Sequence, residues 1–181
     1  MAFEKFLAQQ KTTILKKWFQ LVLETYPPET ARLLKHEPNQ FANPVGHTTF
    51  HGMEGLLDEL LLEGGPERLT PFLDKIIRIR AIQDFSASRA VGFVFFLKKI
   101  VREELENEAW KEVVSSGEVT AFETKIDELA LLAFNVYMEC REKLYEIRIN
   151  EVKNMSHRLL QRANLIAEIP ESKPGPKDGN A

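Results

Sequence analysis

The chain has 181 residues, of which 44% are hydrophobic and 28% charged, with a formal net charge of -3 at pH 7. These values are typical of a soluble globular protein that buries a substantial core, and the lack of a basic excess argues against a nucleic-acid partner. A single cysteine, Cys140, excludes an internal disulfide and any site built from several cysteines.

The N-terminus and the hydropathy pattern bear on location. The opening "MAFEKFLAQQKTT" contains charged residues and glutamines where a signal peptide needs an apolar run. No stretch approaches the roughly 18 apolar residues of a membrane-spanning helix. We therefore expect a cytoplasmic protein.

The first segments predict helices separated by proline. Apolar residues recur at helical spacing over 3–25. Pro27 and Pro28 end this helix, and Pro28 can open a short second helix over 28–37.

A third helix is predicted over about 44–62. Asn43 can cap its N-terminus, Pro44 suits the first helical position, and the breaker Gly64-Gly65-Pro66 ends it. A fourth covers about 70–82, with Thr70 as N-cap.

The next predicted helix starts at Ser86 or Ser88 and runs to about 105. Its middle, "AVGFVFFLKKIV", is apolar on nearly every side, which is typical of a helix buried between neighbours. We take it as the central helix. Bulky aromatic residues throughout the chain are expected in the core: Trp18, Phe93, Phe95, Phe96, Phe122 and Phe134.

The longest predicted helix runs from about Thr120 to about Ala167 without glycine or proline. Its apolar residues step by threes and fours, which indicates a packing seam within the chain or between chains. The seam comprises Leu129, Ala133, Val136, Cys140, Leu144 and Ile147. Further along, Val152, Met155 and Leu159 lie between polar residues, and we expect them to form a docking surface for another chain.

These elements predict an all-α fold with a long C-terminal helix. We expect a helical domain over 1–150, an extension of the long helix over 151–168, and a disordered Pro/Gly tail over 169–181.

Two histidines raise the question of a metal or haem site. His47, His51, Glu54 and Asp58 share one side of the third helix, so His47, His51 and Glu54 could hold one metal ion. The spacing alone is a weak signal, and polar residues are expected on the outer side of an amphipathic helix. A haem ligand must project into an apolar pocket, whereas these histidines lie off the apolar face. We therefore expect no cofactor.

Other patterns for chemistry are sparse. Arg78, Arg80, Gln83 and Arg89 surround a predicted helix junction and could bind an anion, although such residues more often satisfy helix ends. The sequence contains neither a phosphate-binding glycine loop nor a Gly-x-Ser-x-Gly elbow. We expect no enzymatic activity.

Four segments together resemble a known family. They are "KTTILKKWFQLVLETYP", "FANPVGHTT", "IIRIRAIQDFSASRAVGFVFFLK" and "IDELALLAFNVYMECREKLYEIRINEVK". In order and spacing they are similar to the N-terminal domain of the RsbR and RsbRD co-antagonist proteins of the bacterial stressosome, over about residues 10–153.

The resemblance implies a globin-like, haem-free sensor domain that dimerises and whose long last helix carries signals to a C-terminal STAS domain. Here the long helix is followed only by the Pro/Gly tail, so we expect an input domain whose output is another protein.

The sequence thus favours a non-enzymatic sensory or regulatory module that acts through protein contacts, as a homodimer with an unknown regulatory partner. Truncation after Glu151 is expected to weaken self-association. The alternatives are a metal- or haem-binding protein that uses His47 and His51, or a structural subunit of a larger complex.

Overall fold

The computed structural model describes residues 2–36, 42–62, 64–106, 110 and 112–163, and within these ranges the regular structure is helical throughout. The all-α prediction is confirmed. The chain divides into two compact units, Met1–Lys143 and Leu144–Ala181.

The first unit begins with α1 (Ala2–Glu24) and α2 (Pro28–His36), as the two prolines predict. The backbone N–H of Ala31 donates to the carbonyl of Pro27 at 2.9 Å, so the first hydrogen bond of α2 begins at the residue before Pro28. One face of α1 contributes much of the core: Phe3, Phe6, Leu7, Ile14, Leu15, Trp18, Val22 and Leu23.

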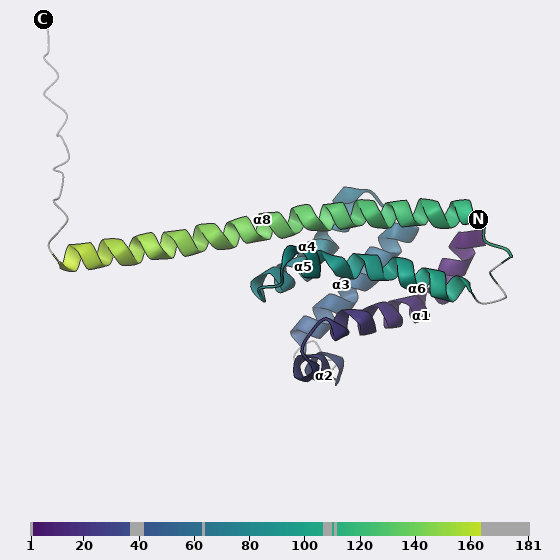
Figure 1. The fold of residues 1–181 in the computed structure, drawn as a ribbon, viewed down its shortest axis with the longest axis horizontal. Coiled ribbons are helices and arrows are strands. Elements are labelled where there is room, and N and C mark those ends of the chain that lie inside the picture. The colour runs from purple at the N-terminus through teal and green to yellow at the C-terminus, as the bar shows by residue number, and fades with distance from the viewer. Residues whose placement is uncertain (1, 37–41, 63, 107–109, 111, 164–181) are drawn as a thin grey trace, which may run out of the picture. The chain divides into compact units, whose positions relative to one another are not determined.

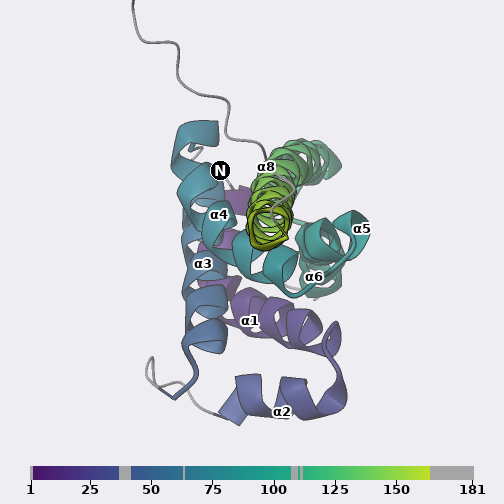
Figure 2. The same ribbon diagram turned by 90° about the vertical axis from the view of Figure 1, so that its left-hand side faces the viewer.

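The third helix, α3 (Pro44–Leu61), has the predicted N-cap. The side-chain oxygen of Asn43 accepts a hydrogen bond from the backbone N–H of Gly46 at 2.8 Å, and Pro44 occupies the first turn. Figure 2 shows α3 beside α4 (Pro66–Ile82). A Cβ atom added at Gly52 would lie 2.8 Å from Cγ1 of Ile76, so the glycine allows the two helices to approach closely.

The predicted start of α4 at Thr70 is wrong. The helix begins at Pro66 with Gly65 as N-cap, and the Thr70 hydroxyl donates to the carbonyl of Pro66 at 2.7 Å from within the helix. Pro71 lies inside the helix, one turn after its start. Pro66 is itself suited to the first turn, so the breaker that ends α3 also opens α4.

The predicted central helix is divided into α5 (Ala87–Val91), a 3₁₀ segment η1 (Gly92–Phe95) and α6 (Phe96–Leu105). Two side chains bond to carbonyls around the break. Nη2 of Arg80 donates to the Arg89 carbonyl at 2.9 Å, and Nε1 of Trp18 donates to the Phe93 carbonyl at 2.7 Å. The two acceptors lie on either side of the change in winding, Arg89 in α5 and Phe93 in η1.

The aromatic residues expected in the core do not all lie there. Trp18, Phe93 and Phe122 are buried, and Phe96 is half-buried. Phe95 and Phe134 are 46% and 44% exposed. The expectation is wrong for these two residues, because each lies on the outer side of a helix whose other side packs inward.

The last helix, α8 (Ser116–Arg162), is continuous (Figure 1) and starts four residues before the predicted Thr120. The helix ends at Arg162, and Ala163 lies in a turn. The final residues of the predicted helix and the whole predicted tail, 169–181, lie outside the described residues.

Candidate interaction surface on the long helix

The start of α8 is fixed by a reciprocal cap. The Ser115 backbone N–H and hydroxyl donate to Oε2 of Glu118 at 3.1 and 2.9 Å, and the Glu118 N–H donates to the Ser115 hydroxyl at 3.3 Å. This is the capping box, in which serine and glutamate satisfy one another's free backbone donors. The bonds from the Ser115 backbone and then its hydroxyl hold the pKa of the Glu118 carboxyl below its usual range.

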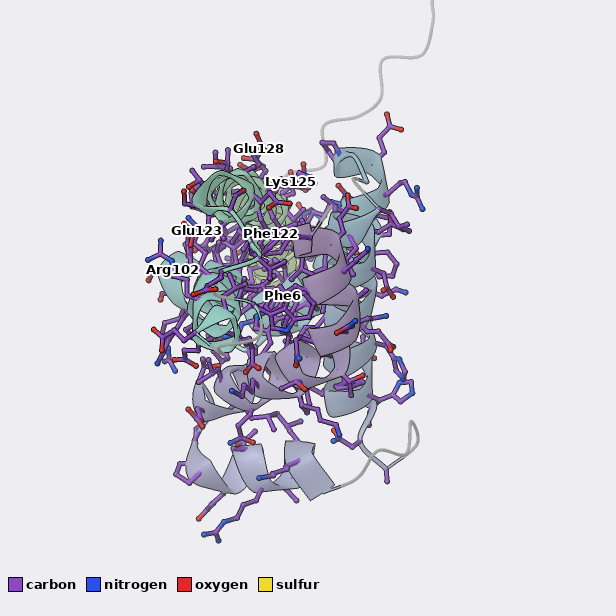
Figure 3. The ribbon with its side chains drawn as sticks, turned by 90° about the vertical axis from the view of Figure 1, so that its right-hand side faces the viewer. Phe6, Arg102, Phe122, Glu123, Lys125 and Glu128 are labelled. Atoms are coloured by element: carbon purple, nitrogen blue, oxygen red, sulfur yellow. The ribbon has the colours of Figure 1, made fainter. Side chains whose placement is uncertain are left out.

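One face of α8 belongs to the core of the first unit. Phe122 meets the Phe3 ring edge-on at 5.2 Å between centroids, and Figure 3 shows Phe122 pointing from α8 into the interior near Phe6. The buried residues of α8 are Phe122, Ile126, Leu129, Ala130, Ala133, Val136 and Tyr137.

This inner face contains the first half of the predicted seam. Leu129, Ala133 and Val136 are buried within their own unit. Cys140 and Leu144 are half-buried, and Ile147 is 55% exposed. The first three residues therefore contribute to the packing of this domain and leave no surface for a second chain.

Ion pairs join α6 to the first part of α8. Arg102 Nη2 donates to Oε2 of Glu123 at 2.9 Å, and Figure 3 shows the two side chains facing each other. Lys98 Nζ donates to Oδ1 of Asp127 at 2.6 Å. The bond from Arg102 holds the pKa of Glu123 below its ordinary value.

Three further bonds connect α8 with the junction between α4 and α5. The Tyr137 hydroxyl donates to the Phe85 carbonyl at 2.6 Å in a buried position. Arg141 Nη1 donates to the Ala81 carbonyl at 3.2 Å and to Oδ1 of Asp84 at 3.1 Å. Asp84 has a φ of 57°, the left-handed region that non-glycine residues seldom adopt, so these bonds hold a strained turn in place.

A second set of apolar side chains on α8 is exposed. In the first unit it comprises Leu131, Phe134 and Met138, of which Leu131 is 69% exposed. At about 100° per residue, these side chains lie roughly 130° round the helix from the buried face. None of the three belongs to the buried core of their own unit.

The second unit continues the pattern with Tyr145, Ile149, Val152, Met155 and Leu159, all of them exposed. Five members across the two units, Leu131, Met138, Tyr145, Val152 and Leu159, are each seven residues apart in the sequence. We call the residues named in this paragraph, together with Phe134, the exposed stripe. Sequence reasoning singled out Val152, Met155 and Leu159 but missed the rest, although the sevenfold spacing was available to find them.

The histidine pair lies at the surface of α3. The rings of His47 and His51 are 4.2 Å apart between centroids, and Nδ1 of His51 lies 3.1 Å from Oε2 of Glu54. Within the described ranges, no three histidine, cysteine or acidic side chains are grouped closely enough to hold a metal ion.

The predicted arginine group is divided by the structure. Arg78 pairs with Asp74 on the exposed side of α4, with Nη2 2.9 Å from Oδ1. Arg80 and Arg89 lie together, and Arg89 Nη2 donates to the Thr25 carbonyl at 2.7 Å. Gln83 is the exposed C-cap of α4.

Arg80 is fully buried, and burial lowers its pKa. Its Nη2 donates to the Thr25 hydroxyl at 3.0 Å as well as to Arg89, whereas Nε and Nη1 have no acceptor among the described residues. Three rings surround the guanidinium carbon: Tyr26 at 5.5 Å, Phe85 at 4.4 Å and Phe93 at 5.6 Å. The faces of aromatic rings attract such a cation and stabilise it in this apolar site.

Cys140 is half-buried, and burial raises the pKa of its thiol. A raised pKa reduces the fraction of thiolate, which is the reactive form. In the described part of the chain, no helix is both long and apolar enough to cross a membrane.

The described residues therefore form an all-helical fold with a long C-terminal helix, whose part in the first unit has one buried and one exposed apolar face. The chain belongs to the family described as the RsbT co-antagonist protein rsbRD N-terminal domain, which it matches over residues 12–152. The resemblance predicted from the four segments is confirmed. No curated protein and no solved structure matches the chain. The family is one of stressosome-related regulatory domains of the sensor type.

Proposed function

We propose that this chain is a non-enzymatic regulatory module that pairs with a second copy of itself along the exposed stripe and passes a signal to a partner protein through α8. The observation that carries the proposal is the sevenfold spacing of exposed Leu131, Met138, Tyr145, Val152 and Leu159. Apolar residues that repeat every seven positions keep facing a partner helix as two helices wind around each other.

The stripe is large enough to support association. Burying a side chain such as valine or leucine contributes about 1.5–3 kcal/mol. Burying a few such side chains from each chain therefore contributes a free energy of the same order as the roughly 4–15 kcal/mol that association costs. The exposed stripe provides enough apolar side chains on each chain for this.

The route for the signal follows from the bonds that hold α8 in the first unit. Tyr137 and Arg141 bond to the strained turn at Asp84, where α4 meets α5. A change in this turn would alter bonds to α8 directly. Small shifts of packed helices are an established means of switching.

The proposal is tested by the mass of the particle in solution. Sedimentation equilibrium of the full chain is expected to show a dimer. Val152→Lys combined with Leu159→Lys places four charges in a paired interface, and is expected to weaken association at least 100-fold, about 2.8 kcal/mol at 1.4 kcal/mol per factor of ten.

Ile147→Lys is the matched control. Ile147 is 55% exposed and lies on α8, but its position in the sevenfold repeat places it on the opposite side from Val152. This variant is expected to associate as the unchanged chain does. A monomeric unchanged chain, or equal weakening by the two sets of substitutions, would refute pairing along the stripe.

A further inference from the structure

A cavity of about 290 Å³ lies where α1, α2 and α3 meet. It is lined by Phe19 from α1, Leu34 and Lys35 from α2, and His47, Phe50 and His51 from α3. None of these residues takes part in the packing of α8 described above. The cavity is therefore a candidate ligand site separate from the exposed stripe on α8.

The apolar wall of the cavity is aromatic. Phe19 and Phe50 meet edge-on, with ring centroids 5.3 Å apart and planes at 89°. Leu34 completes this wall from α2. Such a surface favours the hydrocarbon part of a ligand, because contact with the rings removes apolar area from water.

The polar side chains that line the cavity, among the residues the structure describes, are basic in type. They are Lys35, His47 and His51. The nearby carboxylate of Glu54 is bonded to Nδ1 of His51. An ammonium group and two imidazoles beside an aromatic wall suit a ligand with one negative charge.

The cavity is held open by the contact between α2 and α3. Nδ2 of Asn43, a buried residue, donates to the Leu34 carbonyl at 2.7 Å, and the Asn43 side-chain oxygen accepts from Gly46. A Cβ atom added at Gly46 would lie 2.7 Å from the Leu34 carbonyl oxygen. Asparagine and glycine therefore fix the distance between the two helices, so that the walls exist before a ligand arrives.

We propose that this cavity binds a small amphipathic anion, a carboxylate with an apolar body and about ten non-hydrogen atoms in all. The size follows from the volume, because a water molecule occupies about 30 Å³ in the liquid and 290 Å³ accommodates about ten groups of that size. The hydrocarbon lies against Phe19 and Phe50, and the carboxylate meets Lys35 and the two histidines. This goes beyond the proposed pairing and does not depend on it.

The experiment uses octanoate as the probe and the full chain as the protein. Resonances of the His47 and His51 rings are followed by NMR while octanoate is added, so that binding is localised to this cavity. Octanoate is expected to shift both rings saturably. Octan-1-ol, which lacks the charge, and acetate, which lacks the chain, are each expected to bind at least tenfold more weakly.

Lys35→Gln removes the charge of an exposed side chain and keeps a polar end group, and is expected to weaken octanoate binding about five- to tenfold. Lys99→Gln, an exposed lysine on α6, is the matched control and should leave the affinity unchanged. The inference is overturned if octanoate leaves the histidine resonances in place, if octan-1-ol binds as tightly, or if the two lysine variants behave alike. The Val152→Lys, Leu159→Lys protein should bind octanoate normally, which separates this result from the outcome for pairing.

Discussion

At the scale of single residues, the junction between α4 and α5 depends on side chains that come from distant parts of the chain. Tyr137 donates a buried hydrogen bond to the Phe85 carbonyl, and Arg80 donates to Thr25 and Arg89 from within a group of aromatic rings. Each satisfies backbone or hydroxyl groups that lack a partner in regular helix. The turn at Asp84 is therefore specified by tertiary contacts.

Tyr137→Phe tests the buried bond. The substitution keeps the ring but leaves the Phe85 carbonyl without its donor at 2.6 Å, and is expected to lower the free energy of unfolding by about 1–3 kcal/mol. Urea denaturation followed by circular dichroism measures this. A variant as stable as the unchanged chain would contradict the assigned role of the Tyr137 hydroxyl.

At the scale of the element, α8 is fixed at its start by carboxylates and further along by its buried apolar face. Glu118 caps the first turn and Glu123 bonds to Arg102 on α6. The helix has no internal glycine or proline after Gly117, so its length follows from the sequence. Which of its apolar residues face inward depends on the helices that pack against it.

These carboxylates predict how stability varies with pH. The folded pKa values of Glu118 and Glu123 lie below their ordinary value of 4.5, because each carboxylate accepts hydrogen bonds. Their stabilisation is therefore complete above about pH 5 and is lost as pH falls through the lowered values.

Thermal unfolding of Glu123→Gln and the unchanged chain should show this difference. The variant is expected to melt at a lower temperature at pH 7, by a few degrees at most because Arg102 is exposed, and the gap should narrow as the pH falls below 4.5. A gap that is constant with pH would show that the carboxylate charge is not what stabilises this contact.

At the scale of the whole molecule, the sequence predicted most helices because their spacing, prolines and the Asn43 cap are local signals. It misplaced the start of α4, because Pro66 and Pro71 are both suited to a first turn. It also missed η1, where the Phe93 carbonyl accepts a bond from Trp18 on α1, because a contact between residues this far apart leaves no local signal.

The two apolar faces of α8 show that the sequence was equally limited in predicting the candidate interaction surface. Leu129, Ala133 and Val136 step by threes and fours, and so do Leu131, Phe134 and Met138. Periodicity identifies both sets and cannot decide which one the domain buries. The contacts with α1, α4 and α6 decide it, and those contacts link residues far apart in sequence.

The measurement that tests pairing most directly is the alkylation rate of a cysteine on the exposed stripe. In a Cys140→Ala background, Val152→Cys should react several-fold more slowly with iodoacetamide as protein concentration rises, whereas Ile147→Cys should react at a constant rate. This holds whether the two helices run parallel or antiparallel. Rates at position 152 that stay constant over all concentrations would contradict the proposal that a second copy covers this face of α8.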